Sequence, residues 1–284
     1  MSEVMPPIFV LSAAKGGSGK TTLAVNLAHA LSRIVVRDQP KRVLVIDLDA
    51  QGNATNLLGY DDGTFPEASS IKRILNGHAA TPVSAFDVQL VGHNEDAAAM
   101  MQLLANAASM RSFLNGVRAT INVVQPDYVV IDTPPLETPA GGIGALAGSH
   151  VIIPLQPHRH GLAGALRAQQ YVAELCADGG SHIHVAGVVP IMTFRCAAIE
   201  HILAEASEHF GSLMTEPIPL RSVILESSLV GMPVVAFETY RCRELDRTGT
   251  FFDRKKKLKY SEVGTIFDRI ATRLLRTCVL HMGG

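Results

Sequence analysis

Short, nearly continuous apolar runs recur along the chain, as expected for strands that are buried on both faces. The clearest runs are Ile8–Ala13, Arg42–Asp47, Tyr128–Asp132, Val151–Leu155 and His184–Val189, and the weaker ones are Gln89–Gly92 and Val234–Phe237. Helical patterns occupy the stretches between them, at Thr21–Ile34, Ala97–Asn115, Gly161–Ala177 and Ala197–Phe210. Strands that alternate with helices predict a doubly wound α/β fold, with a mostly parallel sheet flanked by helices.

A loop rich in glycine and lysine follows the first predicted strand and reads KGGSGKTT over residues 15–22. Its backbone N–H groups and the following helix N-terminus can cradle phosphates. Lys20 can reach the β- and γ-phosphates, and the Thr21 hydroxyl can ligate Mg²⁺. The predicted nucleotide-binding residues here are Lys15, Gly16, Gly17, Ser18, Gly19, Lys20, Thr21 and Thr22.

This loop departs from the strict P-loop pattern at one position. Ala14 stands where the first glycine is expected, and a second lysine, Lys15, precedes the glycine pair. The arrangement resembles the deviant Walker A motif, K-G-G-x-G-K-[ST]-[ST], of the ParA/MinD ATPases. The resemblance implies a P-loop NTPase fold and a nucleotide-sandwich homodimer, in which Lys15 reaches the phosphates of the partner.

Two carboxylates, Asp47 and Asp49, end the second clear strand. Residues two apart on an extended strand point the same way, which suits a Mg²⁺ water shell and an attacking water. Residues 47–55 read DLDAQGNAT and resemble the D-x-D-P-Q-G-N-A-T element of the ParA family, with Ala50 in place of the proline. The resemblance implies that Asp49 orients the hydrolytic water and that Asp47 supports the metal.

Asp132 ends the apolar run that starts at Tyr128, which is the form of a Walker B strand. Such an acid would hold Mg²⁺ through water, opposite Thr21. The residues IDTPP at 131–135 match the family form I-D-[CT]-P-P. The implied catalytic set is Lys15, Lys20 and Asp49, with ATP and Mg²⁺ as cofactors.

Further similarity to the family continues downstream. Val151–Gln156 looks like the family strand that ends in P-x-Q, and Gly231–Pro233 looks like its G-x-P step. The step at Ile218 and Pro219 resembles the family element whose backbone contacts adenine. The resemblance covers residues 8–238 and predicts a ParA-type partition ATPase of the short class, without an N-terminal helix-turn-helix.

The function implied by this resemblance is a slow, partner-controlled ATPase. An ATP-bound homodimer would bind DNA without sequence preference. A ParB-type centromere-binding protein would trigger hydrolysis and release. No strong general base is evident in the motifs, which favours slow basal hydrolysis.

DNA binding would need a local basic patch, because the formal net charge is only −1. Arg195 and Arg221 are candidates, although the family arginines after I-P correspond here to Leu220 and Val223. The segment 241–259 is basic, and its Lys255, Lys256 and Lys257 could contact phosphates or belong to a solvated loop. We therefore expect an ATPase core over 1–240, with a basic segment and C-terminal helix over 241–284 packed on the same domain.

Composition favours a cytoplasmic protein, and the resemblance to the ParA family implies that it associates with the nucleoid. The four cysteines are scattered without a C-x-x-C pair, the first residues do not form a signal peptide, and no apolar stretch reaches ~18 residues. Membrane attachment is a less favoured hypothesis: a MinD-like ATPase could use Ile266–Leu280 as a basic amphipathic anchor. The sequence also leaves open a ParA-like ATPase that positions a protein cargo, and a metabolic P-loop ligase or reductase.

Overall fold

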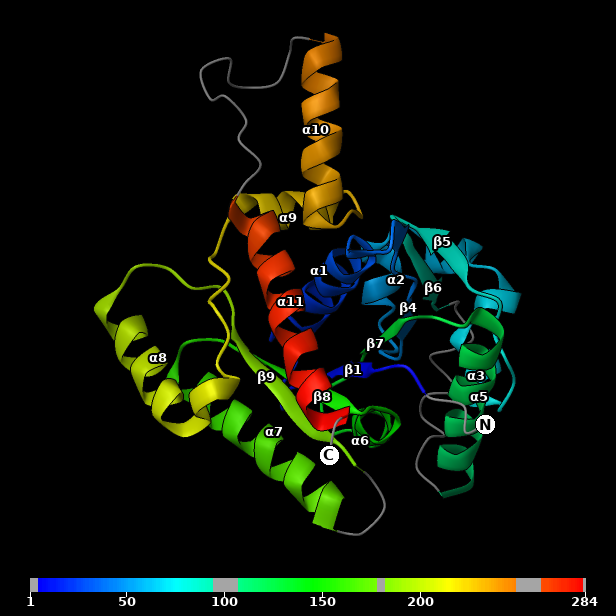
Figure 1. Cartoon of the computed structure of the whole chain (residues 1–284), viewed down its shortest axis with the longest axis horizontal. Coiled ribbons are helices and arrows are strands. Elements are labelled where there is room, and N and C mark those ends of the chain that lie inside the picture. The colour runs from blue at the N-terminus through cyan, green and yellow to red at the C-terminus, as the bar shows by residue number, and fades with distance from the viewer. Residues whose placement is uncertain (1–4, 94–106, 178–181, 249–261, 283–284) are drawn as a thin grey trace.

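The computed structural model describes residues 5–93, 107–177, 182–248 and 262–282 (Figure 1). Its centre is a seven-stranded sheet in the order β5-β6-β4-β7-β1-β8-β9, and a separate two-stranded hairpin pairs β2 with β3. Every neighbouring pair in the large sheet is parallel except β5 with β6. The strands are β1 (Ile8–Leu11), β2 (Val35–Val36), β3 (Gln39–Pro40), β4 (Val43–Asp47), β5 (Val83–Ala85), β6 (Val88–Val91), β7 (Tyr128–Asp132), β8 (His150–Leu155) and β9 (His184–Pro190). The predicted fold class is confirmed.

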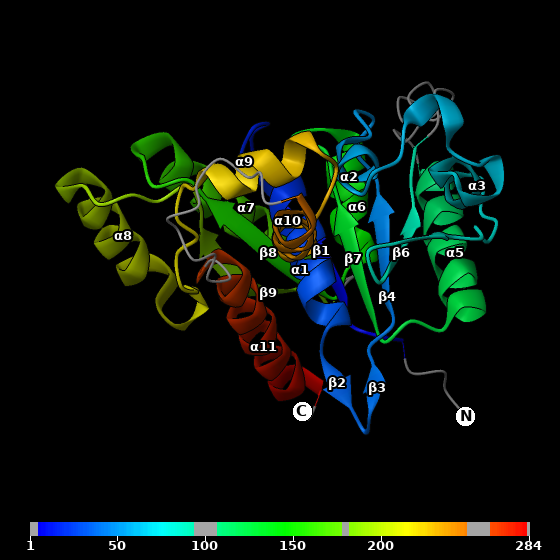
Figure 2. The same ribbon diagram turned by 90° about the horizontal axis from the view of Figure 1, so that it is seen from above.

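Helices cover both faces of the sheet (Figure 2). They are α1 (Lys20–Ser32), α2 (Asn53–Leu57), α3 (Ile71–Leu75), α5 (Ala107–Val124), α6 (Pro139–Ala147), α7 (Arg159–Ala177), α8 (Ala197–Phe210), α9 (Ser222–Leu229), α10 (Val234–Thr248) and α11 (Glu262–Met282). Alternate residues of β1 serve opposite layers: Phe9 packs in the core with α1 and α11, whereas Val10 packs with α3, α5 and α6. The central strands are thus apolar on both faces, which explains their uninterrupted apolar runs.

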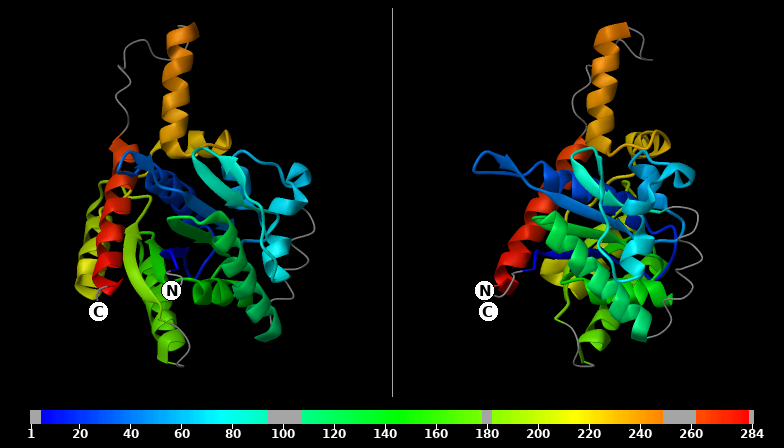
Figure 3. Two further views of the ribbon diagram at one scale, coloured as in Figure 1. Left: turned by 45° about the vertical axis from the view of Figure 1, so that its right-hand side comes forward. Right: turned by 90° about the vertical axis from the view of Figure 1, so that its right-hand side faces the viewer.

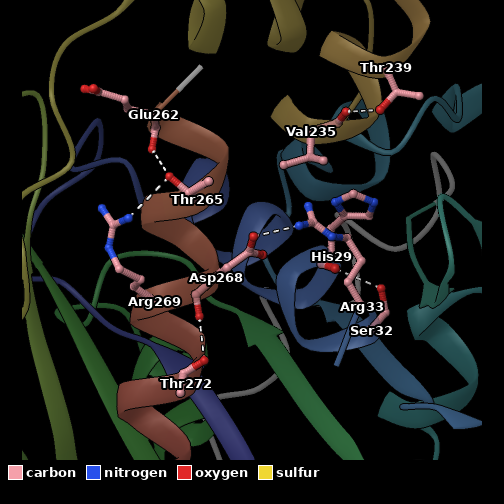
Figure 4. A network of polar contacts seen from close by, with 10 residues as sticks. All are labelled: His29, Ser32, Arg33, Val235, Thr239, Glu262, Thr265, Asp268, Arg269 and Thr272. Atoms are coloured by element: carbon pink, nitrogen blue, oxygen red, sulfur yellow. Dashed lines mark hydrogen bonds and ion pairs between the residues drawn. The ribbon is translucent and has the colours of Figure 1, made fainter. Parts of the chain in front are cut away.

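The predicted C-terminal helix forms as α11 and lies beside α1. Ile266, Ile270 and Leu274 on its apolar face are between 0% and 8% exposed and belong to the core. Arg33, directly after α1, and Asp268 of α11 form an ion pair at 2.6 Å (Figure 4). The apolar face that an amphipathic anchor would insert into a membrane is used here to cover the sheet.

The predicted strand Val234–Phe237 is wrong, because these residues form the first turn of α10. The Val234 N–H donates to the Asn26 side chain of α1 at 2.8 Å, and the Phe237 N–H donates to the Pro233 carbonyl at 2.9 Å. Two adjacent valines favour a strand. Here, however, the Asn26 side chain of α1 accepts the Val234 N–H, a group that would otherwise be unpaired at the start of a helix, and this favours the helix.

Helix α10 stands away from the body of the protein (Figure 3). The expected boundary at 240/241 falls inside this helix, so the change in composition does not mark an element boundary. Lys255, Lys256 and Lys257 lie outside the described residues. In the part of the chain that is described, no single helix is long and apolar enough to span a membrane; α9 and Val234–Arg243 qualify only as a pair bent by 83°.

The helix expected at Ala97–Asn115 is described only over its second half, and it continues beyond the predicted end to Val124. The structure describes α5 from Ala107 to Val124, and residues 94–106 lie outside the description. Gly116 is a residue typical of a helix end, but a Cβ at this position would overlap the Ile74 carbonyl of α3. The glycine therefore allows two helices to approach closely rather than ending one.

Candidate nucleotide site

Three neighbouring strands bring the predicted site together at their carboxyl ends. In the sheet order β4-β7-β1, Asp47 pairs in register with Asp132, and Asp132 pairs with Leu11, from which the chain continues into the glycine loop. Parallel strands end at the same edge, so residues distant in sequence meet there.

The glycine loop leads directly into α1. Gly17 and Gly19 have φ of 69° and 77°, a region that favours glycine. At Gly19 packing adds a second reason, since a Cβ would overlap the Ile191 side chain. α1 begins at Lys20, so its unpaired N–H groups and its positive dipole end lie at the loop. The loop thus has the local geometry that a phosphate cradle requires.

The two lysines of the loop have different environments. Lys20 is 5% exposed, and its ammonium donates to the Lys15 backbone carbonyl at 3.4 Å. Burial lowers the pKa of Lys20, while the nearby Asp132 and Asp49 carboxylates oppose that shift. The Lys15 side chain is exposed. One lysine therefore belongs to its own cradle, and the other is available to a group outside it.

A cleft of about 720 Å³ opens above the loop. Every residue from Gly16 to Thr22 lines it, together with Asp49, Gln51 and Asn53 from the end of β4 and the start of α2. The structure thus brings Asp49 to the same cleft as the cradle, as the hydrolytic role requires. Asp49 is half-buried, and one of its carboxylate oxygens accepts the Gln51 N–H at 3.1 Å.

Asp132 lies beneath this cleft with no solvent exposure. Neither of its carboxylate oxygens has a hydrogen bond of good geometry within the described chain. Burial, and then the adjacent Asp47, raise the pKa of Asp132 well above its usual range, and the nearby Thr21 hydroxyl counteracts part of the rise. A buried carboxylate without a hydrogen-bond partner destabilises the fold unless a ligand neutralises its charge. Asp132 and Thr21 therefore fit a hydrated Mg²⁺.

Asp47 differs from Asp132 because its oxygens already have partners. One oxygen accepts the backbone N–H and the hydroxyl of Thr55, each at 2.8 Å, and the other accepts the Asp49 N–H at 3.2 Å. These bonds hold the start of α2 and the backbone of Asp49. Burial raises the pKa of Asp47, opposed by His93 and by the Thr55 hydrogen bonds. Asp47 therefore holds the backbone of Asp49 in place, and its support of the metal stays a prediction.

Thr55 is a site residue that sequence reasoning did not single out. It is fully buried, donates to Asp47 and accepts the His93 N–H at 3.0 Å. Its signal was present as the final position of the matched DLDAQGNAT stretch. Among the described residues, no three His, Cys, Asp or Glu side chains gather to hold a metal. Mg²⁺ would therefore be shared with the nucleotide phosphates, as is usual for this ion.

A second, apolar pocket of about 250 Å³ adjoins the cradle. Pro219 lines it with Ile218 and Leu220, facing Gly19 and Leu23 across the pocket. Its wall is built by pairing of distant segments, since Thr193 and Ile218 are joined by a backbone hydrogen bond of 3.1 Å. Its apolar lining suits the face of a flat ring such as adenine, and a contact between Pro219 and adenine stays a prediction.

The two candidate DNA-contacting arginines lie at one edge of this region. Arg195 and Arg221 are both exposed. Each stands two residues beyond one member of the Thr193–Pro219 bridge, so they occupy the same end of the molecule. The Arg221 guanidinium donates only to the adjacent Leu220 carbonyl, at 3.3 Å, among the contacts described.

A family model described as an AAA domain matches residues 7–184. The chain belongs to this family and is a P-loop ATPase of the ParA/MinD superfamily. The resemblance inferred from the two-lysine motif is thereby confirmed. ATP with Mg²⁺ is the ligand that the cradle, the apolar pocket and Asp132 of this ATPase fit together.

Relatives with named roles align over most of this ATPase. The chromosome partitioning protein ParA of Caulobacter vibrioides is 28% identical over 245 residues, which span 82% of this chain and 88% of its own. The sporulation initiation inhibitor protein Soj of Bacillus subtilis is 28% identical over 252 residues, which span 82% and 92%. The structure of apo McdA from Cyanothece superimposes with a TM-score of 0.71 at 20% identity, covering 94% of this chain and 99% of that one.

Proposed function

We propose that this ATPase is a ParA-type partition protein that dimerises on ATP, binds DNA without sequence preference and hydrolyses ATP slowly under the control of a ParB-type partner. The observation that carries the proposal is the exposed Lys15 beside a fully formed cradle. A cation that its own site does not use can stabilise the γ-phosphate of a second copy, where positive charge assists phosphoryl transfer most.

The relatives support the partition role, since ParA and Soj each align over 82% of this chain. Arg195 and Arg221 support DNA binding, because two exposed cations at one end of the molecule offer a start for phosphate contacts. In this proposal the protein works in the cytoplasm on the nucleoid. The MinD-like alternative is disfavoured because Ile266, Ile270 and Leu274 are buried against the core.

The deciding experiment measures binding of the purified chain to nonspecific duplex DNA and to anionic liposomes, each with ATP and with ADP. We expect ATP-dependent DNA binding and no liposome binding. ATP-dependent liposome binding without DNA binding would overturn the proposal and favour membrane cycling. Binding to neither would leave a protein cargo as the better hypothesis and would also contradict the DNA step.

Variants make the DNA test specific. Arg195→Ala and Arg221→Ala should each weaken DNA binding and lower the slope of log affinity against log salt by about 0.9 for each phosphate that is no longer neutralised. Arg118→Ala is the matched control, because Arg118 is an exposed arginine on α5, which packs on the other face of the sheet. Replacing Lys255, Lys256 and Lys257 by Glu tests the basic segment in the same assay, and an unchanged slope would assign it to a solvated loop.

A further inference from the structure

Gln156 ties the glycine loop to the wall of the nucleotide pocket. It follows directly after β8, and its side-chain amide nitrogen donates to the Gly17 carbonyl at 2.9 Å and to the Met192 sulfur at 3.3 Å. Met192 lines both the phosphate cleft and the apolar pocket. The Gln156 amide nitrogen therefore contacts both the glycine loop and Met192, the residue shared by the phosphate cleft and the apolar pocket.

His158 fixes the direction of that amide. Its Nδ1 accepts the Gly161 N–H at 3.0 Å, which caps the N-terminus of α7. A ring nitrogen that accepts cannot carry a proton, so in the neutral ring the proton is on Nε2. Nε2 then donates to the Gln156 side-chain oxygen at 3.1 Å. With its oxygen facing His158, Gln156 presents its NH₂ group to Gly17.

The direction of the Gly17 carbonyl decides where the next N–H points. In a trans peptide the C=O of one residue and the N–H of the next point in opposite directions. Gln156 draws the Gly17 carbonyl to its own side, so the Ser18 N–H is turned away from Gln156. Ser18 lines the phosphate cleft. No side-chain packing at Gly17 constrains peptide 17–18, since Gly17 is exposed and a Cβ there would meet no atom within 4 Å.

We propose that Gln156 and His158 are positioning residues for ATP: His158 orients the Gln156 amide, and Gln156 holds peptide 17–18 so that the Ser18 N–H faces the phosphates. Both side chains act on the nucleotide only through the loop. Gln156 is half-buried and His158 is exposed, so their burial contributes little to folding. Their contribution is to the affinity for phosphate groups.

The experiment compares the affinities of five variants for ADP and for a non-hydrolysable ATP analogue by calorimetry, with thermal unfolding of the nucleotide-free proteins. Gln156→Ala removes the donor to Gly17 and should weaken both affinities by about three- to tenfold. Gln156→Glu is nearly isosteric and places a carboxylate oxygen against the Gly17 carbonyl, so it should weaken binding further. This variant keeps the proposal testable if the alanine variant folds poorly.

His158→Asn separates helix capping from amide orientation. Asparagine can still cap α7, but its shorter side chain cannot reach Gln156, so affinity should fall by about two- to fourfold with little change in unfolding temperature. His201→Asn is the matched control: His201 is exposed on α8 and makes no hydrogen bond among those described, so it should leave affinity unchanged.

The double variant Gln156→Ala/His158→Asn decides whether the two residues act in series. If His158 acts through Gln156, the double variant should bind nucleotide as Gln156→Ala does, without further loss. Independent, multiplied losses would contradict the relay. Affinities equal to those of the unaltered protein in Gln156→Ala and Gln156→Glu, or a loss in His201→Asn as large as in His158→Asn, would overturn the proposal altogether.

Discussion

The Lys20 ammonium donates to the Lys15 backbone carbonyl at 3.4 Å. The buried lysine thus contacts the backbone of Lys15, whose own side chain is exposed. The bond gives the buried charge a partner within the loop itself. It also distinguishes the two lysines: the Lys20 side chain is buried within its own loop, whereas the Lys15 side chain is exposed.

This difference predicts opposite phenotypes for the two lysines. Lys20→Ala should abolish ATP binding, because no other described lysine lines the cleft. Lys15→Ala should retain ATP binding and lose dimer-coupled hydrolysis by about 10³-fold, the usual effect of removing a cation supplied to phosphoryl transfer. Calorimetry and steady-state ATP turnover check both. Normal turnover by Lys15→Ala would exclude a role for Lys15 across a dimer.

Asp132→Asn should exchange activity for stability. The buried carboxylate has no partner of good geometry in the described chain, and burial and Asp47 raise its pKa. At neutral pH the burial of this carboxyl therefore destabilises the nucleotide-free fold, and the cost diminishes as the pH falls below its raised pKa towards the ordinary value. The neutral amide should stabilise the nucleotide-free protein by on the order of 1 kcal/mol.

The same change should weaken Mg²⁺ dependence and hydrolysis, because the amide loses the charge that attracts the ion. Urea unfolding with and without MgADP provides the measurement. Stabilisation by MgADP should be smaller in the variant than in the unaltered protein. An amide variant that is less stable without nucleotide would contradict the interpretation of Asp132 as an unpaired buried acid.

Asp49→Asn should separate ATP binding from hydrolysis. Asp49 lines the cleft, whereas Asp47 below it is fully engaged by Thr55 and the Asp49 backbone. The asparagine variant should bind ATP within about threefold of the unaltered protein and hydrolyse it at least ~100-fold more slowly. Asp61→Asn, at an exposed turn, is the control and should keep both properties. Equal loss of binding and hydrolysis would place Asp49 in nucleotide binding instead.

His29 should make the fold sensitive to acid. It is 5% exposed on α1, and burial, with Arg33 adding to it and Asp87 opposing it, lowers its pKa to about 4. The unfolded chain takes up this proton near pH 6.5, so the stability contributed by neutral His29 is complete above that pH. It is lost as the pH falls from about 6.5 towards 4, by up to about 3 kcal/mol.

Urea unfolding between about pH 7.5 and 5 checks this expectation against His29→Leu. The leucine variant fits an apolar site and cannot take up a proton, so its stability should fall less steeply below about pH 6.5. Parallel curves for the two proteins would assign the acid sensitivity to groups other than His29.

The strands that carry the site and the identity of the phosphate loop could be read from local sequence. A strand buried on both faces must be apolar throughout, and a phosphate cradle needs glycines at positive φ before a helix start; both are local demands visible in residues 8–22. The acids at the strand ends could be placed for the same reason, because parallel strands end at one edge.

The hydrogen-bond partners of the individual site residues depend instead on contacts between segments that are distant in the chain. Asp47 is engaged by Thr55 while Asp132 is not, and Val234 begins a helix because Asn26 satisfies its N–H. Gln156 reaches Gly17, 139 positions away in the chain. Such hydrogen bonds and close packing form only when the whole fold brings the partners together, so no local pattern encodes them.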